Sequence, residues 1–189
     1  DILADCLKNF EIPFFRGSLN NVYKRFMSFL VQKNFIYCFR INADCPLISP
    51  STIIDLINFS EKIDSQFDYI STVMDSSFPV GEHVEFFKVE QFLKNYDLAC
   101  KEEENLEHVT PIFYKNKNLF KCIPFTNKYK TPDRLRLCVD YPEDLKVVRS
   151  IVSYFSSKDN FSLIDIVKLF ETNQSIFLPN IKISKKRTL

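Results

Sequence analysis

The chain has 189 residues, 46% of them hydrophobic, which is enough for one core of ordinary size. Its 25 basic and 24 acidic side chains give a net charge of +1, and this balance argues against a nucleic-acid-binding surface. No apolar run approaches the roughly 20 residues that cross a bilayer, so we expect no membrane segment.

The first residues and the cysteines indicate the cellular compartment of the protein. The chain opens Asp1-Ile2-Leu3-Ala4-Asp5, without the basic and apolar regions of a signal peptide. Its six cysteines lie far apart and never form a Cys-x-x-Cys pair, and the two histidines do not favour a zinc site. These features predict a protein of the reducing cytoplasm.

Hydrophobic patterns predict elements of both kinds along the chain. Helices are expected over residues 1–9, 21–33, 89–95 and 142–155, with two more that begin at Ser51 and Ser162 as N-caps. Strands are expected over residues 12–15, 35–40, 68–73, 84–87, 119–125 and 135–139. Helices and strands alternate early and strands cluster late, which is typical of an α/β sandwich around a mostly parallel sheet with some antiparallel strands.

One carboxylate stands at the end of the first confident strand. The apolar run over 35–39 leads to Asp44, and Pro46 follows shortly after. Open α/β sheets bind their ligands at the carboxyl ends of buried strands, and a proline stiffens the corner on which this side chain sits. Taken alone, Asp44 is as simply explained as a turn residue without a chemical role.

A second strand ends in the same way. The run over 135–139 is followed by Asp140, and Pro142 then opens a helix. If the two strands lie close in the sheet, Asp44 and Asp140 project into one crevice. Two carboxylates together with substrate phosphates are a usual way to hold Mg²⁺. The alternative is that Asp140 caps the following helix, and one side chain could do both.

Glycine is scarce, which limits how phosphate could be bound. Gly17 and Gly81 are the only two in the sequence. Gly-rich phosphate loops need several glycines at fixed spacing, so none can be built from this chain. A nucleoside triphosphate would therefore be gripped by another kind of loop, or by a segment outside these residues.

Four blocks of sequence carry a family resemblance. They are Phe15-Arg16-Gly17-Ser18 with 21–26, Arg40 to Ile48, Phe78 to Phe87 with Glu107-His108-Val109-Thr110-Pro111, and Leu135 to Leu145. In these blocks the chain resembles the cytidylyltransferase family that includes the CMP-Kdo and acylneuraminate synthetases. The block over 107–111 points to the branch named for the spore-coat polysaccharide biosynthesis protein F. The resemblance covers nearly all of residues 1–189 as a single domain.

The resemblance implies a Rossmann-like, glycosyltransferase-A-type nucleotidyltransferase fold, with a mostly parallel mixed sheet sandwiched by helices. It implies transfer of CMP from CTP to an acidic, Kdo- or sialic-acid-like or related sugar, with release of pyrophosphate, for surface polysaccharide synthesis. Mg²⁺ would be the cofactor, and Asp44 and Asp140 would be its catalytic ligands. Family members often form dimers, so a homodimer is possible.

The remaining site residues also come from the resemblance. Asp44 and the segment Arg16-Gly17-Ser18 match positions near the nucleotide, although that segment could be a surface turn. The sugar side is matched by Glu85, Glu107, His108 and Arg136. His108 could be a base or only a hydrogen-bonded wall residue. Arg136 alternates with two leucines, so it faces either the substrate or solvent.

The chain also departs from the family pattern. The family begins with a strand and a phosphate-gripping loop ending in Leu-Pro-Gly-Lys, which do not occur here; roughly 50–60 residues, about two βαβ units, are missing. Val80 replaces the Asp of the family's Pro-Asp-Gly. We therefore expect an N-terminally truncated fold, with exposed sheet edge and apolar surface, that turns over CTP poorly. The alternatives are a glycosyltransferase that uses a nucleotide-sugar and a non-catalytic truncated module.

Overall fold

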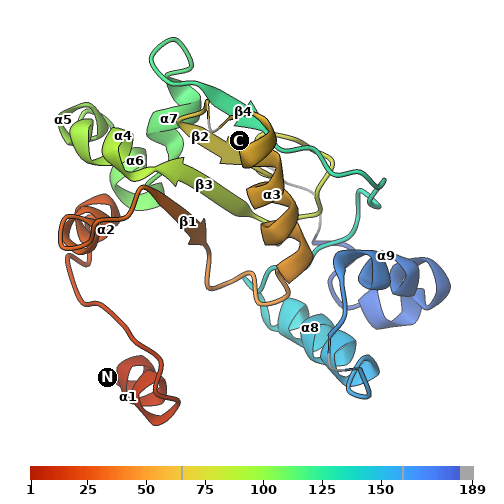
Figure 1. Ribbon diagram of the computed structural model, residues 1–189. Coiled ribbons are helices and arrows are strands. Elements are labelled where there is room, and N and C mark those ends of the chain that lie inside the picture. Colours follow the sequence, from red (N-terminus) through yellow and green to blue (C-terminus); the bar gives the residue numbers. More distant parts are fainter. Residues whose placement is uncertain (65, 159, 184–189) are drawn as a thin grey trace. The chain divides into compact units, whose positions relative to one another are not determined.

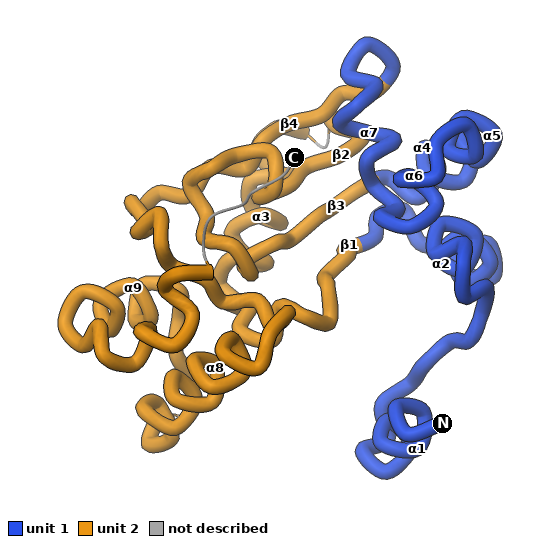
Figure 2. Tube along the Cα trace, turned by 180° about the vertical axis from the view of Figure 1, so that it is seen from behind, with its two compact units in different colours: residues 1–38, 88–119 blue, residues 39–87, 120–189 orange. Residues whose placement is uncertain are grey.

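The computed structural model describes residues 1–64, 66–158 and 160–183 (Figure 1). It divides into two compact units (Figure 2). Unit 1 comprises residues 1–38 and 88–119, and unit 2 comprises residues 39–87 and 120–189. The single domain expected from the sequence stays a prediction. Within the described residues, no helix has both the length and the hydropathy needed to cross a membrane.

Unit 1 is helical. Its helices are α1 (Ile2–Asn9), α2 (Val22–Leu30), α4 (Val89–Lys94), α5 (Tyr96–Ala99), α6 (Glu103–His108) and α7 (Pro111–Lys115). Helix α2 packs against α4 and α6. At this contact the fully buried ring of Tyr23 stacks on Phe92, with 4.0 Å between ring centroids, and its hydroxyl donates to the Phe92 carbonyl at 2.5 Å. Burial, and to a smaller degree the nearby Cys100, raises the pKa of Tyr23.

The sheet is mixed, which confirms the predicted α/β class. Its strands are β1 (Tyr37–Ile41), β2 (Tyr69–Ser71), β3 (Val84–Lys88) and β4 (Cys122–Pro124), in the order β1-β3-β2-β4. Strand β2 pairs antiparallel with β3, where Ile70 lies opposite Phe86, and parallel with β4, where Ile70 lies opposite Ile123. The unit boundaries at residues 38/39 and 87/88 fall within β1 and β3.

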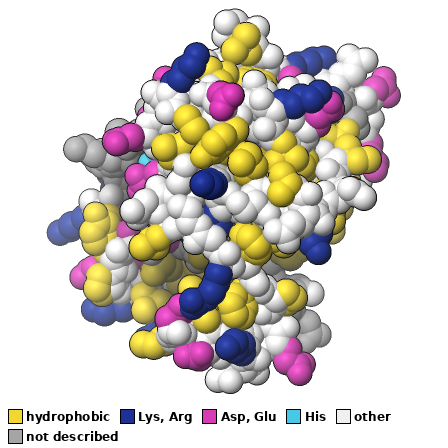
Figure 3. Space-filling model, turned by 90° about the vertical axis from the view of Figure 1, so that its left-hand side faces the viewer, with side chains coloured by type: hydrophobic (Ala, Val, Ile, Leu, Met, Phe, Trp, Pro, Cys, Tyr) yellow, Lys and Arg dark blue, Asp and Glu magenta, His cyan; other side chains and the backbone are white. Residues whose placement is uncertain are grey.

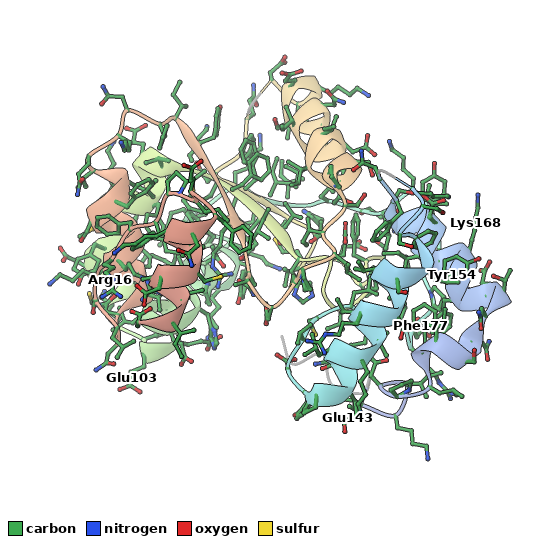
Figure 4. All side chains as sticks on the ribbon, turned by 90° about the horizontal axis from the view of Figure 1, so that it is seen from below. Arg16, Glu103, Glu143, Tyr154, Lys168 and Phe177 are labelled. Atoms are coloured by element: carbon green, nitrogen blue, oxygen red, sulfur yellow. The ribbon has the colours of Figure 1, made fainter. Side chains whose placement is uncertain are left out.

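Unit 2 adds helices to this sheet. They are α3 (Pro50–Lys62), α8 (Pro142–Tyr154), α9 (Leu163–Thr172) and the 3₁₀ helix η1 (Gln174–Phe177). Helix α3 lies over one face of the sheet (Figure 1). Helices α8 and α9 both contact η1, and the buried ring of Phe177 meets Phe170 of α9 with 4.9 Å between centroids (Figure 4).

The helix starts follow local sequence signals with one correction. Ser162 caps α9 as predicted, because its hydroxyl accepts from the backbone N–H of Asp165 while that carboxylate accepts from Ser162. Pro142 opens α8 as predicted. Ser51 was expected to cap α3, but the helix begins at Pro50 with Ser49 as N-cap. This shift has a tertiary cause, because the Ser49 N–H is held by a carboxylate from another segment.

Two predicted strands do not form. Residues 12–15 are exposed, and no strand of the described structure pairs with them. Residues 135–139 make one isolated bridge, in which Arg136 pairs with Val80. Its backbone donors do not reach a single neighbouring strand: Leu135 donates to the Pro132 carbonyl within its own turn, Leu137 to Val80 and Val139 to Asp44, so no ladder is built.

Apolar side chains remain on the surface of both units, most densely along residues 1–38. Hydrophobic and charged side chains lie interspersed on the face shown in Figure 3. Residues 1–38 contain strongly exposed examples, among them Ile2, Leu19 and Ile36. The buried aromatic rings of unit 2, such as Phe67 and Phe87, show the opposite arrangement.

Candidate active site

The two carboxylates predicted at strand ends lie on adjoining segments of unit 2. Asp44 follows β1 in the loop before α3, and Asp140 lies just before α8. The N–H of Val139 donates to the Asp44 carbonyl at 2.7 Å, which places the two backbones side by side. Asp44 is half-buried, and the Asp140 side chain is 47% exposed. Both carboxylates can therefore be reached from solvent.

A glycine allows the turn over residues 78–81 to lie directly against the backbone of residues 137 and 138. The N–H of Leu137 donates to the Val80 carbonyl at 2.7 Å, next to Gly81. Gly81 has φ of +99°, and a Cβ there would lie well inside 3.0 Å of the Cys138 backbone nitrogen. Only glycine combines this backbone conformation with so close a backbone neighbour. The Phe78–Gly81 turn thus holds the segment that leads to Asp140.

Glu82, the next residue, holds the loop that leads from Asp44 into α3. Its side chain is completely buried, and one carboxylate oxygen accepts from the Ser49 N–H at 3.0 Å and from the Thr52 hydroxyl at 2.6 Å. The other oxygen is buried with no hydrogen-bond partner in the described structure. Burial raises the pKa of Glu82, although the hydrogen bonds from Thr52 and Ser49 oppose that rise. The sequence prediction missed this residue.

The Asp140 side of the site rests on a buried ion-pair network. Arg136 Nε donates to Asp144 Oδ1 at 3.0 Å, and its guanidinium also pairs with Asp140. Asp144 is completely buried and accepts further hydrogen bonds from the backbone N–H groups of Asp140 and Tyr141, both at 3.1 Å, and from Asn180. The side chain that caps the start of α8 is therefore Asp144, at its third position, rather than Asp140.

Charge pairing outweighs burial in this network. Burial alone would lower the pKa of Arg136, but its hydrogen bonds to Asp144 and Asp140 raise the pKa above the ordinary value. Burial alone would raise the pKa of Asp144, but Arg136, Asn180 and the Asp140 N–H together lower it. Both groups are therefore charged at neutral pH, so removing either one would leave a buried charge without its partner.

A cysteine thiol donates a hydrogen bond to each of the two solvent-accessible carboxylates. The Cys45 Sγ donates to Asp44 Oδ1 at 3.4 Å, and the Cys138 Sγ donates to Asp140 Oδ2 at 3.5 Å. Burial raises the pKa of both thiols, that of Cys138 to about 12, and the neighbouring carboxylates raise them further. At neutral pH these cysteines are therefore neutral hydrogen-bond donors rather than thiolate metal ligands.

The oxygens left over on the two carboxylates suit a hard cation. Asp44 Oδ2 and Asp140 Oδ1 make no hydrogen bond within the described part of the chain. In residues 1–64, 66–158 and 160–183, no three His, Cys, Asp or Glu side chains gather into a metal-binding group. A pair of carboxylates fits Mg²⁺, which keeps several waters and needs few protein ligands.

Glu85, predicted on the sugar side, lies in β3 and is buried. It accepts from the Tyr69 hydroxyl at 2.6 Å and forms an ion pair with Arg40 of β1. Arg136, the other sugar-side residue of unit 2, is 8% exposed and bound to Asp144 and Asp140. It thus faces its carboxylate partners, where the sequence had suggested substrate or solvent. A substrate role for Glu85 and Arg136 stays a prediction.

The remaining predicted residues belong to unit 1. Arg16 is exposed and pairs with Asp1 (Figure 4). Gly17 lies against the Arg25 side chain, and the Ser18 hydroxyl accepts from the backbone N–H of residue 21 at 3.1 Å. The exposed Glu107 and His108 end helix α6. The structure therefore presents Arg16, Glu107 and His108 to solvent within this unit, and their roles also stay predictions.

Comparisons with known proteins identify the family of the chain. The cytidylyltransferase family model matches residues 3–183. A solved structure of a cytidylyltransferase from Leptospira borgpetersenii serovar Hardjo-bovis is 27% identical and superimposes with a TM-score of 0.83, over 100% of this chain and 76% of that one. A protein of Methanocaldococcus jannaschii, described as uncharacterized, is 28% identical over 185 residues, which are 97% of this chain and 73% of that protein. Because the family match spans almost the whole chain and the solved relative shares its fold, this chain belongs to the cytidylyltransferase family.

Proposed function

We propose that the protein transfers CMP from CTP to an acidic sugar of the Kdo or sialic-acid kind, with release of pyrophosphate. A nucleotidyltransferase activity in general is supported by the family and by the solved relative. The sugar class and a role in surface polysaccharide synthesis rest on the sequence blocks that resemble the CMP-Kdo and spore-coat branch.

One observation carries the proposal: the hydrogen bond from Val139 to Asp44 brings two solvent-accessible carboxylates onto adjoining backbones. Asp44 Oδ2 and Asp140 Oδ1 are the oxygens that would hold Mg²⁺. When bound, the ion would neutralise charge that develops on the phosphate oxygens of the nucleotide. Arg136, Cys45 and Cys138 hold the other oxygens of the two carboxylates, and this fixes the orientation of the pair.

The reaction itself needs a nucleophile and a leaving group in line. A hydroxyl oxygen of the sugar forms a bond to the α-phosphorus of CTP, and the bond from that phosphorus to the bridging oxygen of the β-phosphate breaks. Pyrophosphate leaves with that bridging oxygen, and the hydroxyl proton passes to solvent or to a base. We propose Arg16, Gly17 and Ser18 for nucleotide binding. We propose Glu85, Glu107, His108 and Arg136 for the sugar side.

Metal binding tests the core of the proposal without turnover. Mn²⁺, used as a paramagnetic probe, should bind the chain and be displaced by Mg²⁺. The variants Asp44→Asn and Asp140→Asn should each weaken Mn²⁺ binding about tenfold or more, because each removes one of only two carboxylate ligands. Asp133→Asn, an exposed position of unit 2, is the matched control and should bind as the wild type does. Equal binding by all four proteins would refute the metal site.

Pyrophosphate release then tests the reaction. CTP is supplied with Mg²⁺ and a panel of acidic sugars, to the 189-residue chain and to a version extended at its N-terminus. We expect poor turnover by the 189-residue chain, because it has no Gly-rich loop to grip a triphosphate, and the extended version tests whether added residues supply that grip. Release of nucleotide from a nucleotide-sugar, without pyrophosphate, would favour a glycosyltransferase instead.

A further inference from the structure

Unit 2 contains a second concave site, separate from the two carboxylates. A cavity of about 210 Å³ lies between the first turns of α3, residues 125–131 after β4, and the start of α9. Its described lining includes neither Asp44 nor Asp140, and neither of the sugar-side residues of this unit. The cavity is therefore separate from the residues of unit 2 assigned to the function proposed above.

One part of the cavity wall is apolar and aromatic. The rings of Phe78 and Phe125 are stacked, with 5.9 Å between centroids and 24° between planes, and both side chains are buried. Leu163, Ile164 and Val167 of α9 add aliphatic surface. Such a wall suits the apolar face of a ring, because aromatic and aliphatic carbons supply contact area without demanding hydrogen bonds.

The rest of the wall carries hydrogen-bonding groups, and one of them is unsatisfied. Ser51, Thr126 and Tyr129 contribute hydroxyls. The Asn127 Nδ2 is buried and has no partner among the residues described. Its amide orientation is set, because Oδ1 accepts from the Tyr129 N–H at 3.2 Å. Buried donors are nearly always paired, and Asn127 lines the cavity, so a small rotation of its side chain would give this amide an acceptor on a bound molecule.

The described lining of the cavity carries one positive and one negative side chain. Lys128 and Asp55 are its only charged members in the described structure, and their side chains pair at 3.2 Å. Both are substantially exposed, at 66% and 46%. An exposed pair of this kind is weak, but it leaves the lining without a net charge for an ionic group to pair with, and this favours a neutral ligand.

We propose that this cavity binds a neutral, hydroxylated ring of the size of a single sugar. One face of the ring packs on Phe78, Phe125 and the α9 side chains. Its hydroxyls meet the Ser51 hydroxyl, and one of its oxygens accepts from Asn127 Nδ2. A pyranose has both an apolar face and a rim of hydroxyl donors and acceptors, which is the combination that this lining provides.

Saturation-transfer NMR on the 189-residue chain tests the proposal, with methyl α-D-glucopyranoside as the probe. Ile164→Trp should abolish the signal by filling the cavity. Asn127→Leu should weaken binding about five- to tenfold, because it removes one neutral hydrogen bond. Leu178→Trp, the same kind of substitution at an exposed position of unit 2, should leave binding unchanged. Far-UV circular dichroism of each variant shows that it is folded.

Several results would overturn the inference. They are the absence of binding by the wild-type chain, and equal binding by the Ile164→Trp and Leu178→Trp proteins. Glucose 1-phosphate that binds better than the methyl glucoside, and loses this advantage in Lys128→Ala, would show that the site selects an anion. Cytidine that binds in place of the glucoside would assign the cavity to a nucleoside. None of these readouts depends on cytidylyl transfer, so the failure of one proposal leaves the other standing.

Discussion

The two regions that contain predicted site residues are held in opposite ways. In unit 2, the segments around Asp44 and Asp140 are joined by a backbone hydrogen bond and supported by the buried Arg136–Asp144 pair. In unit 1, Arg16 makes an ion pair whose two side chains are 64% and 62% exposed. The comparison teaches that the carboxylates are pre-organised by buried contacts, whereas the contacts of Arg16 cost little to exchange for a ligand.

Substituting the two glycines tests the difference between the two units most directly, because Gly17 lies in unit 1 and Gly81 in unit 2. Gly81→Ala should destabilise the protein by about 3 kcal/mol or more, because a positive φ and an overlap with backbone atoms act together. Gly17→Ala should cost less than about 1 kcal/mol, because the new methyl would lie closest to Arg25 Cγ, at 2.8 Å on a flexible side chain, and 3.3 Å from the nearest backbone atom, the Arg25 Cα. Urea unfolding measures both variants. Equal losses would mean that the two regions are equally rigid.

The buried ion pair should show an effect of similar size. Arg136→Met should cost about 3–5 kcal/mol, because it leaves the buried Asp144 charge without its cation. Adding Asp144→Asn should recover part of this loss, since the unpaired charge is then removed. Thermal or urea unfolding of four proteins decides the point: the wild type, each single variant and the double variant. If the double variant loses as much stability as the two single variants together, Arg136 and Asp144 do not act as a unit.

Substitutions of Glu82 should change the stability of the protein by a smaller amount, and that amount should depend on pH. Glu82→Ala should cost about 1–3 kcal/mol, because it leaves the Ser49 N–H and the Thr52 hydroxyl without their acceptor. Burial raises the pKa of Glu82 in the folded state. Its contribution to stability is therefore complete below the unfolded pKa of about 4.3 and is lost as the pH rises through the folded pKa.

Glu82→Gln removes this titration while keeping one acceptor oxygen. The Gln variant should therefore be more stable, relative to the wild type, at pH 7 than at pH 4, measured as a larger free energy of unfolding. Urea unfolding of both proteins at the two pH values measures the difference. A relative stability that does not change between pH 4 and pH 7 would contradict a raised pKa for this carboxyl.

Arg16 should have the smallest effect on stability. Arg16→Met removes an exposed ion pair, so unfolding by urea should not distinguish it from the wild type. If Arg16 contacts a phosphate, the same variant should weaken CTP binding about tenfold, because it loses a charge-assisted hydrogen bond. Titration calorimetry measures that binding. Lys94→Met, which removes another exposed pair of unit 1, is the control and should bind CTP normally.

Sequence patterns predicted the elements that depend on local chemistry. Ser162 and Pro142 mark helix starts because capping and proline geometry act within a few residues. The position of Asp44 after an apolar strand predicted a functional loop, although the strand itself is only half-buried. The segment over 135–139 misled the prediction, because its apolar alternation says nothing about whether a partner strand is within reach.

By itself, the sequence determined the α/β class, most of the helices, the family, and Asp44 and Asp140 as candidate ligands. Only the tertiary structure decided that these two lie on adjoining segments, that Gly81 and Glu82 hold them, and that Asp144 supports Asp140 through Arg136. Local patterns report on neighbours a few residues away. Burial, close packing and ion pairing depend on segments that meet only when the chain is folded.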